Sequence, residues 1–161
     1  AGRSQGRCAV SRRPAVASAA PRVVFDTALL LRSLLAGSSA AQALRQSWQD
    51  AACQPLVDAD AARGLMLALG APSLGLSAAQ QQELLADFLP YAQVIQRPEK
   101  SQPLRPQRGL PLLQRQALTL ARQARARWLV SDSPALKLYF ERHRVARPLE
   151  LVSSEKFLAG L

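Results

Sequence analysis

A chain of 161 residues is long enough to bury one substantial core, so no metal cluster or disulfide framework is needed to hold it together. Its 48% apolar content argues against disorder throughout, and its longest apolar run, residues 28–35, contains Arg32 and Ser33 and is too short for a membrane anchor. The formal charge of +10 favours a polyanionic partner such as RNA, although solubility or an arginine-rich genome would explain it equally well.

Residues 1–21 contain several arginines, no acid and no continuous apolar stretch of the kind that secretion requires. We interpret them as a basic, disordered N-terminal arm, which either contacts nucleic acid or is lead sequence. The folded domain is expected to occupy residues 22–161.

Short segments rich in β-branched or aromatic residues alternate with segments of helical apolar spacing. In the first third of the chain they predict a strand at Arg22–Asp26, followed by helices at Thr27–Ala36 and through Trp48. The middle third is predicted to contain a strand at Gln54–Asp58, a helix through Leu69, a helix at Ala78–Leu89, a strand at Tyr91–Ile95 and a long polar loop at 96–111. The last third is predicted to contain a helix from Leu113 to Ala124, a strand at Arg127–Ser131, a helix at Ser133–Arg142, a strand at Leu149–Val152 and a terminal helix capped by Ser153.

This alternation predicts an α/β fold: a three-layer α/β/α sandwich with a central, mostly parallel five-stranded sheet. In such sheets, ligands bind beyond the carboxyl ends of the strands. Attention therefore falls on Asp26, after the first strand, and on the Ser131-Asp132-Ser133 turn, after the fourth.

The chain contains, in this order, the blocks VVFDTALLLRSLLAG, PLVDADAARGLMLALGAPSLGLS, LLADFLPYAQVI, LVSDSPAL and LELVSSEKFL. Their order and spacing resemble the PIN-domain family, in particular the putative toxins of bacterial toxin–antitoxin systems. The resemblance covers Arg22 to Leu158, which is essentially the whole predicted domain.

The resemblance implies a metal-dependent endoribonuclease, in which clustered carboxylates hold Mg²⁺ or Mn²⁺ and an activated water cleaves RNA. Such chemistry needs several acids, because hard divalent cations prefer oxygen ligands and negative charge offsets their partial dehydration. The resemblance also implies a homodimer and a small antitoxin whose tail enters an acidic cleft.

Most of the acids that the resemblance calls for are replaced in this chain. Asp26 and Thr27 match the Asp-Thr-Asn motif of the first strand end, but Ala28 replaces the asparagine. Gly64 stands where the family has an acid on the helix after the second strand, and the family's acid at the start of the helix after the long loop aligns near Gln114. The metal site is therefore predicted to be degenerate.

In the turn after the fourth strand, Asp132 lies one residue earlier than the family's acid, and Ser133 holds the acid's usual place. We predict Asp26 and Asp132 as the candidate catalytic and metal-binding residues. Thr27, Ser131 and Ser133 are then the residues beside the ion.

These acids also have structural interpretations. Asp26 can cap the helix that follows it, and Asp58 and Asp60 precede a helix at capping positions, although either could replace a missing metal ligand. We favour capping for all of them.

Three functions remain open. The favoured hypothesis is a PIN-like protein with lost or strongly impaired RNA cleavage that still binds RNA or protein. The alternative is an active Mg²⁺- or Mn²⁺-dependent endoribonuclease using Asp26 and Asp132, and a third is a DNA-binding or purely structural α/β module.

The sequence also suggests where partners would bind. A basic surface near the cleft would track RNA phosphates, although the same arginines also fit a solvated helix face; they are Arg105, Arg108, Arg115, Arg122, Arg125 and Arg127. An antitoxin would be recognised through apolar helices at Leu30, Leu34 or the Leu84 and Leu85 face, where core packing is the competing use. With only Cys8 and Cys53, far apart, we predict a reducing cytoplasm and neither a disulfide framework nor a zinc site.

Overall fold

The computed structural model describes residues 20–96, 109–145 and 147–161 of the chain. Within these residues it confirms the predicted sheet, which has five parallel strands in the order β3-β2-β1-β4-β5. The strands are β1 (Arg22–Phe25), β2 (Gln54–Val57), β3 (Gln93–Val94), β4 (Trp128–Val130) and β5 (Glu150–Val152).

The central strand β1 supplies side chains to both faces of the sheet. Val23 and Phe25 pack in one apolar cluster and Val24 in the other, because successive residues of a strand point to opposite faces. All three are at most 5% exposed. A continuous apolar run is typical of a parallel strand covered on both faces, and the structure shows that this is its position.

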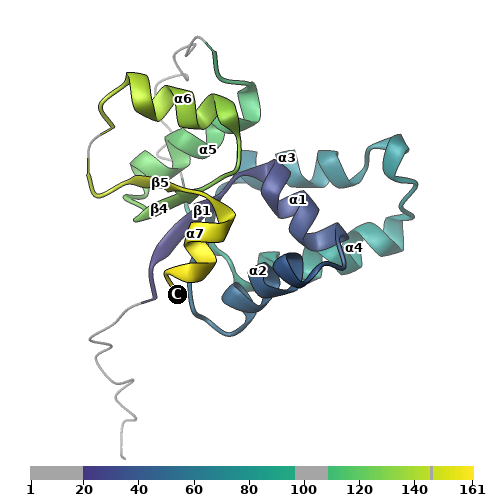
Figure 1. Cartoon of the computed structure of the whole chain (residues 1–161). Helices are drawn as coiled ribbons and strands as arrows, with labels where there is room; N and C mark the ends of the chain where they lie inside the picture. Colours follow the sequence, from purple (N-terminus) through teal and green to yellow (C-terminus); the bar gives the residue numbers. More distant parts are fainter. Residues whose placement is uncertain (1–19, 97–108, 146) are drawn as a thin grey trace, which may run out of the picture.

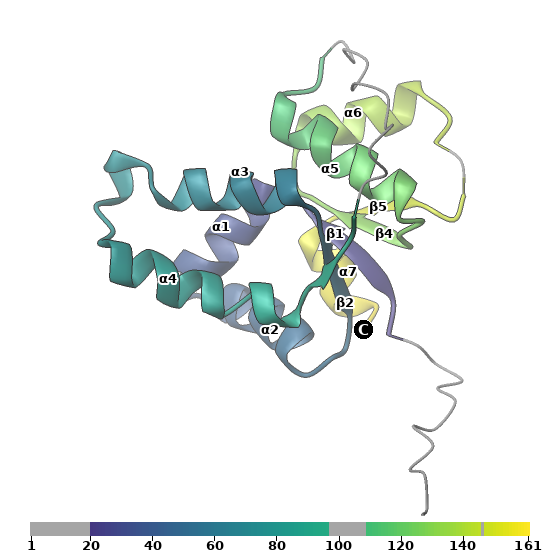
Figure 2. The same cartoon turned by 180° about the vertical axis from the view of Figure 1, so that it is seen from behind.

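Helices cover both faces, which confirms the three-layer architecture (Figure 1). The helices α5 and α6 lie over one face, and α2 and α7 lie over the other (Figures 1 and 2). The helices are α1 (Thr27–Leu35), α2 (Ser39–Gln49), α3 (Ala59–Leu69), α4 (Ala78–Ala86), α5 (Leu112–Gln123), α6 (Pro134–Arg142) and α7 (Ser154–Ala159), with short 3₁₀ helices at Pro72–Leu74 and Leu89–Tyr91.

A chain of aromatic rings packs the face covered by α2 and α7. Phe25 on the sheet contacts Trp48 of α2 and Phe157 of α7 edge to face, with ring centroids 5.5 and 5.4 Å apart. Trp48 in turn contacts Phe88 at 5.2 Å and donates a hydrogen bond from Nε1 to the carbonyl oxygen of Asp87. These contacts place α7 beside the end of β1, where the site described below begins.

The third strand and the helix before it are shorter than the sequence predicts. We expected a helix through Leu89 and a strand at Tyr91–Ile95, whereas α4 ends at Ala86 and β3 contains only Gln93 and Val94. The segment between them forms a 3₁₀ turn, in which the Tyr91 amide donates to the carbonyl of Phe88. Pro90 fits this turn because its φ angle is already restricted to helical values.

Some of the predictions fall on residues that the structure does not describe. Residues 1–19 of the predicted arm and residues 97–108 of the predicted loop lie outside the described residues, as does Cys8.

Cys53 is free and buried. Burial raises the pKa of its thiol to about 11, although the hydrogen bond with Ser47 acts in the opposite direction. None of the described helices combines the length and apolar character needed to cross a membrane.

Candidate functional site

The candidate site lies at the carboxyl edge of the sheet, the edge at which the parallel strands end. The strands β1 and β4 are neighbours, but the chain leaves β1 for β2 on its other side, so this is the point where the strand order reverses. The Asp26 amide donates to the carbonyl of Val130 at 3.0 Å, which joins the two strand ends. The predicted site residues Asp26 and Ser131 are therefore brought together, as the order of the strands requires.

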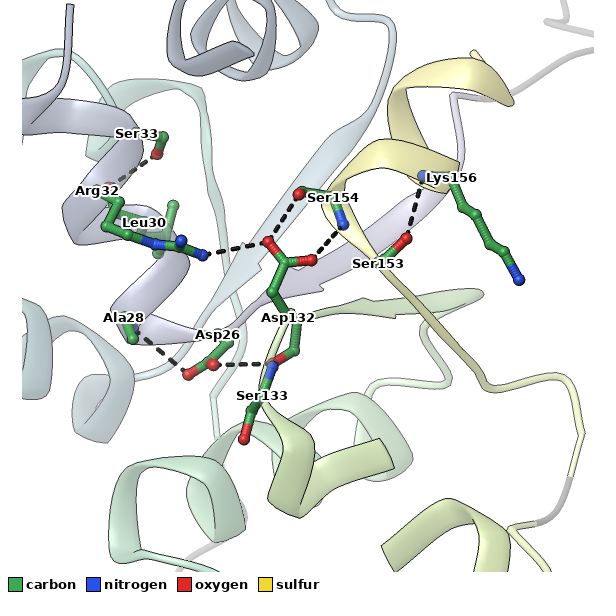
Figure 3. Close-up of polar contacts among 11 residues, drawn as sticks. Asp26, Ala28, Leu30, Arg32, Ser33, Asp132, Ser133, Ser153, Ser154 and Lys156 are labelled. Atoms are coloured by element: carbon green, nitrogen blue, oxygen red, sulfur yellow. Dashed lines mark hydrogen bonds and ion pairs between the residues drawn. The ribbon is translucent and has the colours of Figure 1, made fainter. Parts of the chain in front are cut away.

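Asp26 is buried, with 3% of its surface exposed, and both of its carboxylate oxygens accept hydrogen bonds. Oδ2 accepts from the Ser131 hydroxyl at 2.8 Å, and Oδ1 accepts from the Ala28 amide at 3.4 Å (Figure 3). The second contact makes Asp26 the N-cap of α1, which confirms the capping interpretation. The carboxylate is thus engaged with the protein itself.

The serines beside Asp26 extend this network toward α5. The Ser131 hydroxyl accepts a hydrogen bond from the Ser133 amide at 3.0 Å, and the Ser133 hydroxyl accepts one from Nε2 of Gln114 at 2.7 Å. Ser133 occupies a position at which the family resemblance calls for an acid, and Gln114 lies near another. The structure therefore brings these positions together, but as a neutral pair joined by a hydrogen bond.

Asp132 is directed away from Asp26, toward α1 and α7 (Figure 3). Its carboxylate accepts hydrogen bonds from the amide and the hydroxyl of Ser154, at 2.9 and 2.7 Å, and pairs with the guanidinium of Arg32 at 3.1 Å. Burial alone raises the pKa of Asp132, but the Ser154 hydrogen bonds and the Arg32 charge together lower it. Asp132 is consequently ionised, and its charge is compensated by Arg32.

Gly64, where the resemblance calls for another acid, lies in α3 against α5. It is buried, and a Cβ atom added to it would lie 2.8 Å from Cδ2 of Leu113. A larger side chain fits only if Leu113 moves. Thr27 is also buried and lines a small internal cavity with Leu65 and Leu113, so its side chain faces the core.

A cavity of about 470 Å³ opens beyond the ends of β4 and β5. Its lining includes Ser131, Asp132 and Ser133, together with Lys137 of α6 and Lys156 of α7. The two lysines are exposed, and neither forms an ion pair with any described residue. The cavity therefore adds positive charge beside the candidate acids.

The remaining candidate acids lie at the end of β2. The Asp58 carboxylate accepts a hydrogen bond from the Ala61 amide at 2.7 Å and caps α3, as predicted, and Asp60 lies in the first turn of that helix. Both line a separate cavity between the ends of β2 and β3. Among the described residues, no three side chains of His, Cys, Asp or Glu converge in a way that could hold a metal ion.

The structure corrects our placement of the basic surface. We predicted Arg122, Arg125 and Arg127 near the cleft, but α5 runs back across the sheet and ends just before β4 begins. These arginines therefore lie at the amino edge, the opposite edge of the sheet, where the strands begin. Arg115, near the start of α5, is at the carboxyl edge, and Arg105 and Arg108 lie outside the described residues.

The sequence interpretation missed the two partners of Asp132. Ser154 follows β5, which pairs with β4, so the neighbouring strand ends carry the signal that Ser154 and Asp132 would meet. Arg32 lies one hundred positions away in the sequence from Asp132, on α1, and no local pattern joins them.

No protein-family model, curated protein or solved structure matches this chain. The fold defines the chain as a parallel α/β protein with strand order 3-2-1-4-5. At the point between β1 and β4 where the strand order reverses, it has polar residues but few acids.

Proposed function

We propose that this chain is a PIN-like protein, related to the ribonuclease toxins of bacterial toxin–antitoxin systems, in which metal-dependent RNA cleavage is lost or strongly impaired and RNA or protein binding is retained. The motif resemblance and the parallel sheet with its strand-end site support the kinship. The state of the carboxylates supports the loss of cleavage.

One observation carries the proposal: the two candidate acids are held apart by different partners. Asp26 is engaged by Ser131 and the start of α1, whereas Asp132 is engaged by Ser154 and Arg32. An ion bound by both would require Asp132 to give up its charged hydrogen bonds. That exchange is unfavourable, because the carboxylate would leave a cation and two donors behind.

The donor set does not fit a catalytic divalent ion. Mg²⁺ needs about six oxygen ligands in octahedral geometry, and carboxylates normally supply the charge that offsets its dehydration. At or near the other positions where the family has acids, this chain has Gly64, Gln114 and Ser133. Lys137 and Lys156 in the adjoining cavity would further repel a cation. Metal-dependent cleavage is therefore not expected at this site.

The structure separates buried from exposed apolar side chains on the helices that could bind a protein partner. Leu30, Leu34 and Leu85 are buried and belong to the core, so they are not available to an antitoxin. The exposed large apolar side chains of α3 are Met66 and Leu67, at 49% and 71% exposure. A protein partner, whether an antitoxin or a second copy, would find its apolar contacts there. The cytoplasmic location stays a prediction.

A cleavage assay tests the proposal. Purified full-length protein is incubated with labelled RNA and either Mg²⁺ or Mn²⁺, beside the D26N variant and an EDTA control. We expect that adding the divalent ion produces no cleavage by wild type beyond that seen with D26N. Cleavage that requires the ion and disappears in a folded D26N variant would overturn the proposal in favour of the active endoribonuclease. Circular dichroism establishes that D26N is folded.

A further inference from the structure

The amino edge of the sheet collects arginines from two segments that are separate in the sequence, residues 122–127 and residues 142–147. The helices α5 and α6 run antiparallel to the strands, so their last residues lie beside the first residues of β4 and β5 (Figures 1 and 2). The arginines at these chain positions are Arg122, Arg125, Arg127, Arg142, Arg144 and Arg147.

Three of these arginines surround one cavity. Arg122, Arg125 and Arg147 line a space of about 470 Å³ whose other lining residues are apolar, among them the buried Ala121 and Leu149. No acidic residue is part of this lining. Arg122, Arg125 and Arg147 form no ion pair with any residue in the described part of the chain. Their charge is therefore available to a bound anion.

Aromatic side chains lie among the arginines and order some of them. The Arg122 guanidinium lies 5.9 Å from the centroid of the Tyr139 ring and donates to its hydroxyl at 3.5 Å. The Tyr139 ring stacks on His143, with centroids 4.3 Å apart. Arg127 lies 4.6 Å from the ring of Trp128, which packs against Phe157 on the other face of the sheet and is not part of this pocket. An arginine that rests on an aromatic ring, as Arg122 does, loses less freedom when it binds an anion.

We propose that this amino-edge pocket is the RNA-binding site of the protein and that it holds the phosphodiester backbone of single-stranded RNA. This inference rests on the RNA-binding part of the proposed function. A guanidinium donates planar, paired hydrogen bonds to phosphate oxygens, and several guanidinium groups around one cavity suit successive phosphates better than a single ion. The acid-poor carboxyl edge is then not the surface that holds the RNA.

Fluorescence anisotropy with a labelled single-stranded RNA of about 12 nucleotides tests this assignment. The R122E/R147E variant alters the amino edge, and K137E/K156E exchanges the same number of cations for anions at the carboxyl edge. We expect R122E/R147E to weaken RNA binding at least about tenfold and to reduce the slope of log affinity against log salt by about 1 or more. K137E/K156E should weaken binding no more than about twofold.

The matched pair of variants separates position from net charge. Equal losses in the two variants, or a larger loss in K137E/K156E, would overturn the amino-edge assignment. R147E alone serves as a second variant, because Arg147 is exposed and its removal leaves the Arg122 contact with Tyr139 intact. If R122E/R147E fails to fold, an unchanged affinity in folded R147E likewise overturns the assignment, and an approximately threefold or greater loss supports it.

The same samples keep the two proposals distinguishable. Adding Mg²⁺ or Mn²⁺ and resolving the RNA on a gel reports cleavage independently of affinity. Divalent-dependent cleavage that D26N abolishes would overturn the proposed function, while the two edge variants would still show where RNA binds. Wild-type protein that fails to bind RNA even at low salt would overturn this inference and leave only the protein-binding part of the proposed function.

Discussion

The carboxylate of Asp132 ties together three parts of the chain, because it follows β4, bonds to the start of α7 and pairs with Arg32 on α1. Its negative charge also lies next to the N-terminus of α7, where helix dipoles favour anions. At the scale of single residues, this side chain is better suited to positioning α7 than to holding a cation.

We expect D132N to lower the free energy of unfolding by about 1 kcal/mol at neutral pH, through loss of the ion pair and weakening of the hydrogen bonds to Ser154. The pKa of Asp132 is lowered in the folded protein. Ionisation therefore stabilises the fold at neutral pH, and this contribution is lost as the pH falls below about 4. Urea denaturation at neutral pH and at a pH below about 4 measures this effect. The difference in free energy of unfolding between wild type and D132N should become smaller at the acidic pH.

D87N is the matched control for this measurement, because Asp87 is an exposed acid at the end of a helix. Its effect should stay within about 0.5 kcal/mol. A D132N variant as stable as wild type at neutral pH would show that the Asp132 contacts do not stabilise the fold.

At the scale of elements, the packing of α3 against α5 determines what Gly64 can become. Alanine is favoured over glycine within a helix by about 1 kcal/mol, but here a Cβ would meet the Leu113 side chain. We predict that G64A is close to neutral in the wild-type background and stabilises the L113A variant by about 1 kcal/mol, as measured by denaturant unfolding of the four proteins in a double-mutant cycle. Equal effects of G64A in both backgrounds would contradict this packing.

Sequence patterns predicted the elements best where an apolar run was bounded by turn residues. The strand β1 was recognisable because Val23, Val24 and Phe25 stand between Pro21 and Asp26. The short strand β3 was not delimited in the same way. It is an exposed edge strand, with Val94 67% exposed, so no burial pattern marks its ends.

The candidate site was predictable in position but not in detail. Asp26 was identified because it follows a strand of a parallel sheet. All strands of such a sheet end at the same edge, and ligand sites form there. The direction of Asp132 depends on Ser154 and Arg32, which reach it only after β5, α7 and α1 have packed. A local motif does not contain that information.

At the scale of the whole molecule, charge is distributed unevenly between the two edges of the sheet. A net charge of +10 is compatible with a polyanionic partner but does not say where such a partner would bind. The topology places three arginines around one cavity at the amino edge. At the carboxyl edge, Asp26 and Asp58 cap the helices that follow them, and Asp132 pairs with Arg32. RNA binding and metal chemistry can therefore be tested separately on the same protein.

The central claim is that the carboxyl edge cannot hold a catalytic ion. Its most direct test is a titration of wild type and D26N with Mn²⁺, in which electron paramagnetic resonance measures the concentration of free ion. We predict only weak binding, with Kd values above about 1 mM and no difference between the two proteins. A single tight site of micromolar affinity that is present in wild type and absent in folded D26N would contradict the claim that the carboxyl edge cannot hold a catalytic ion.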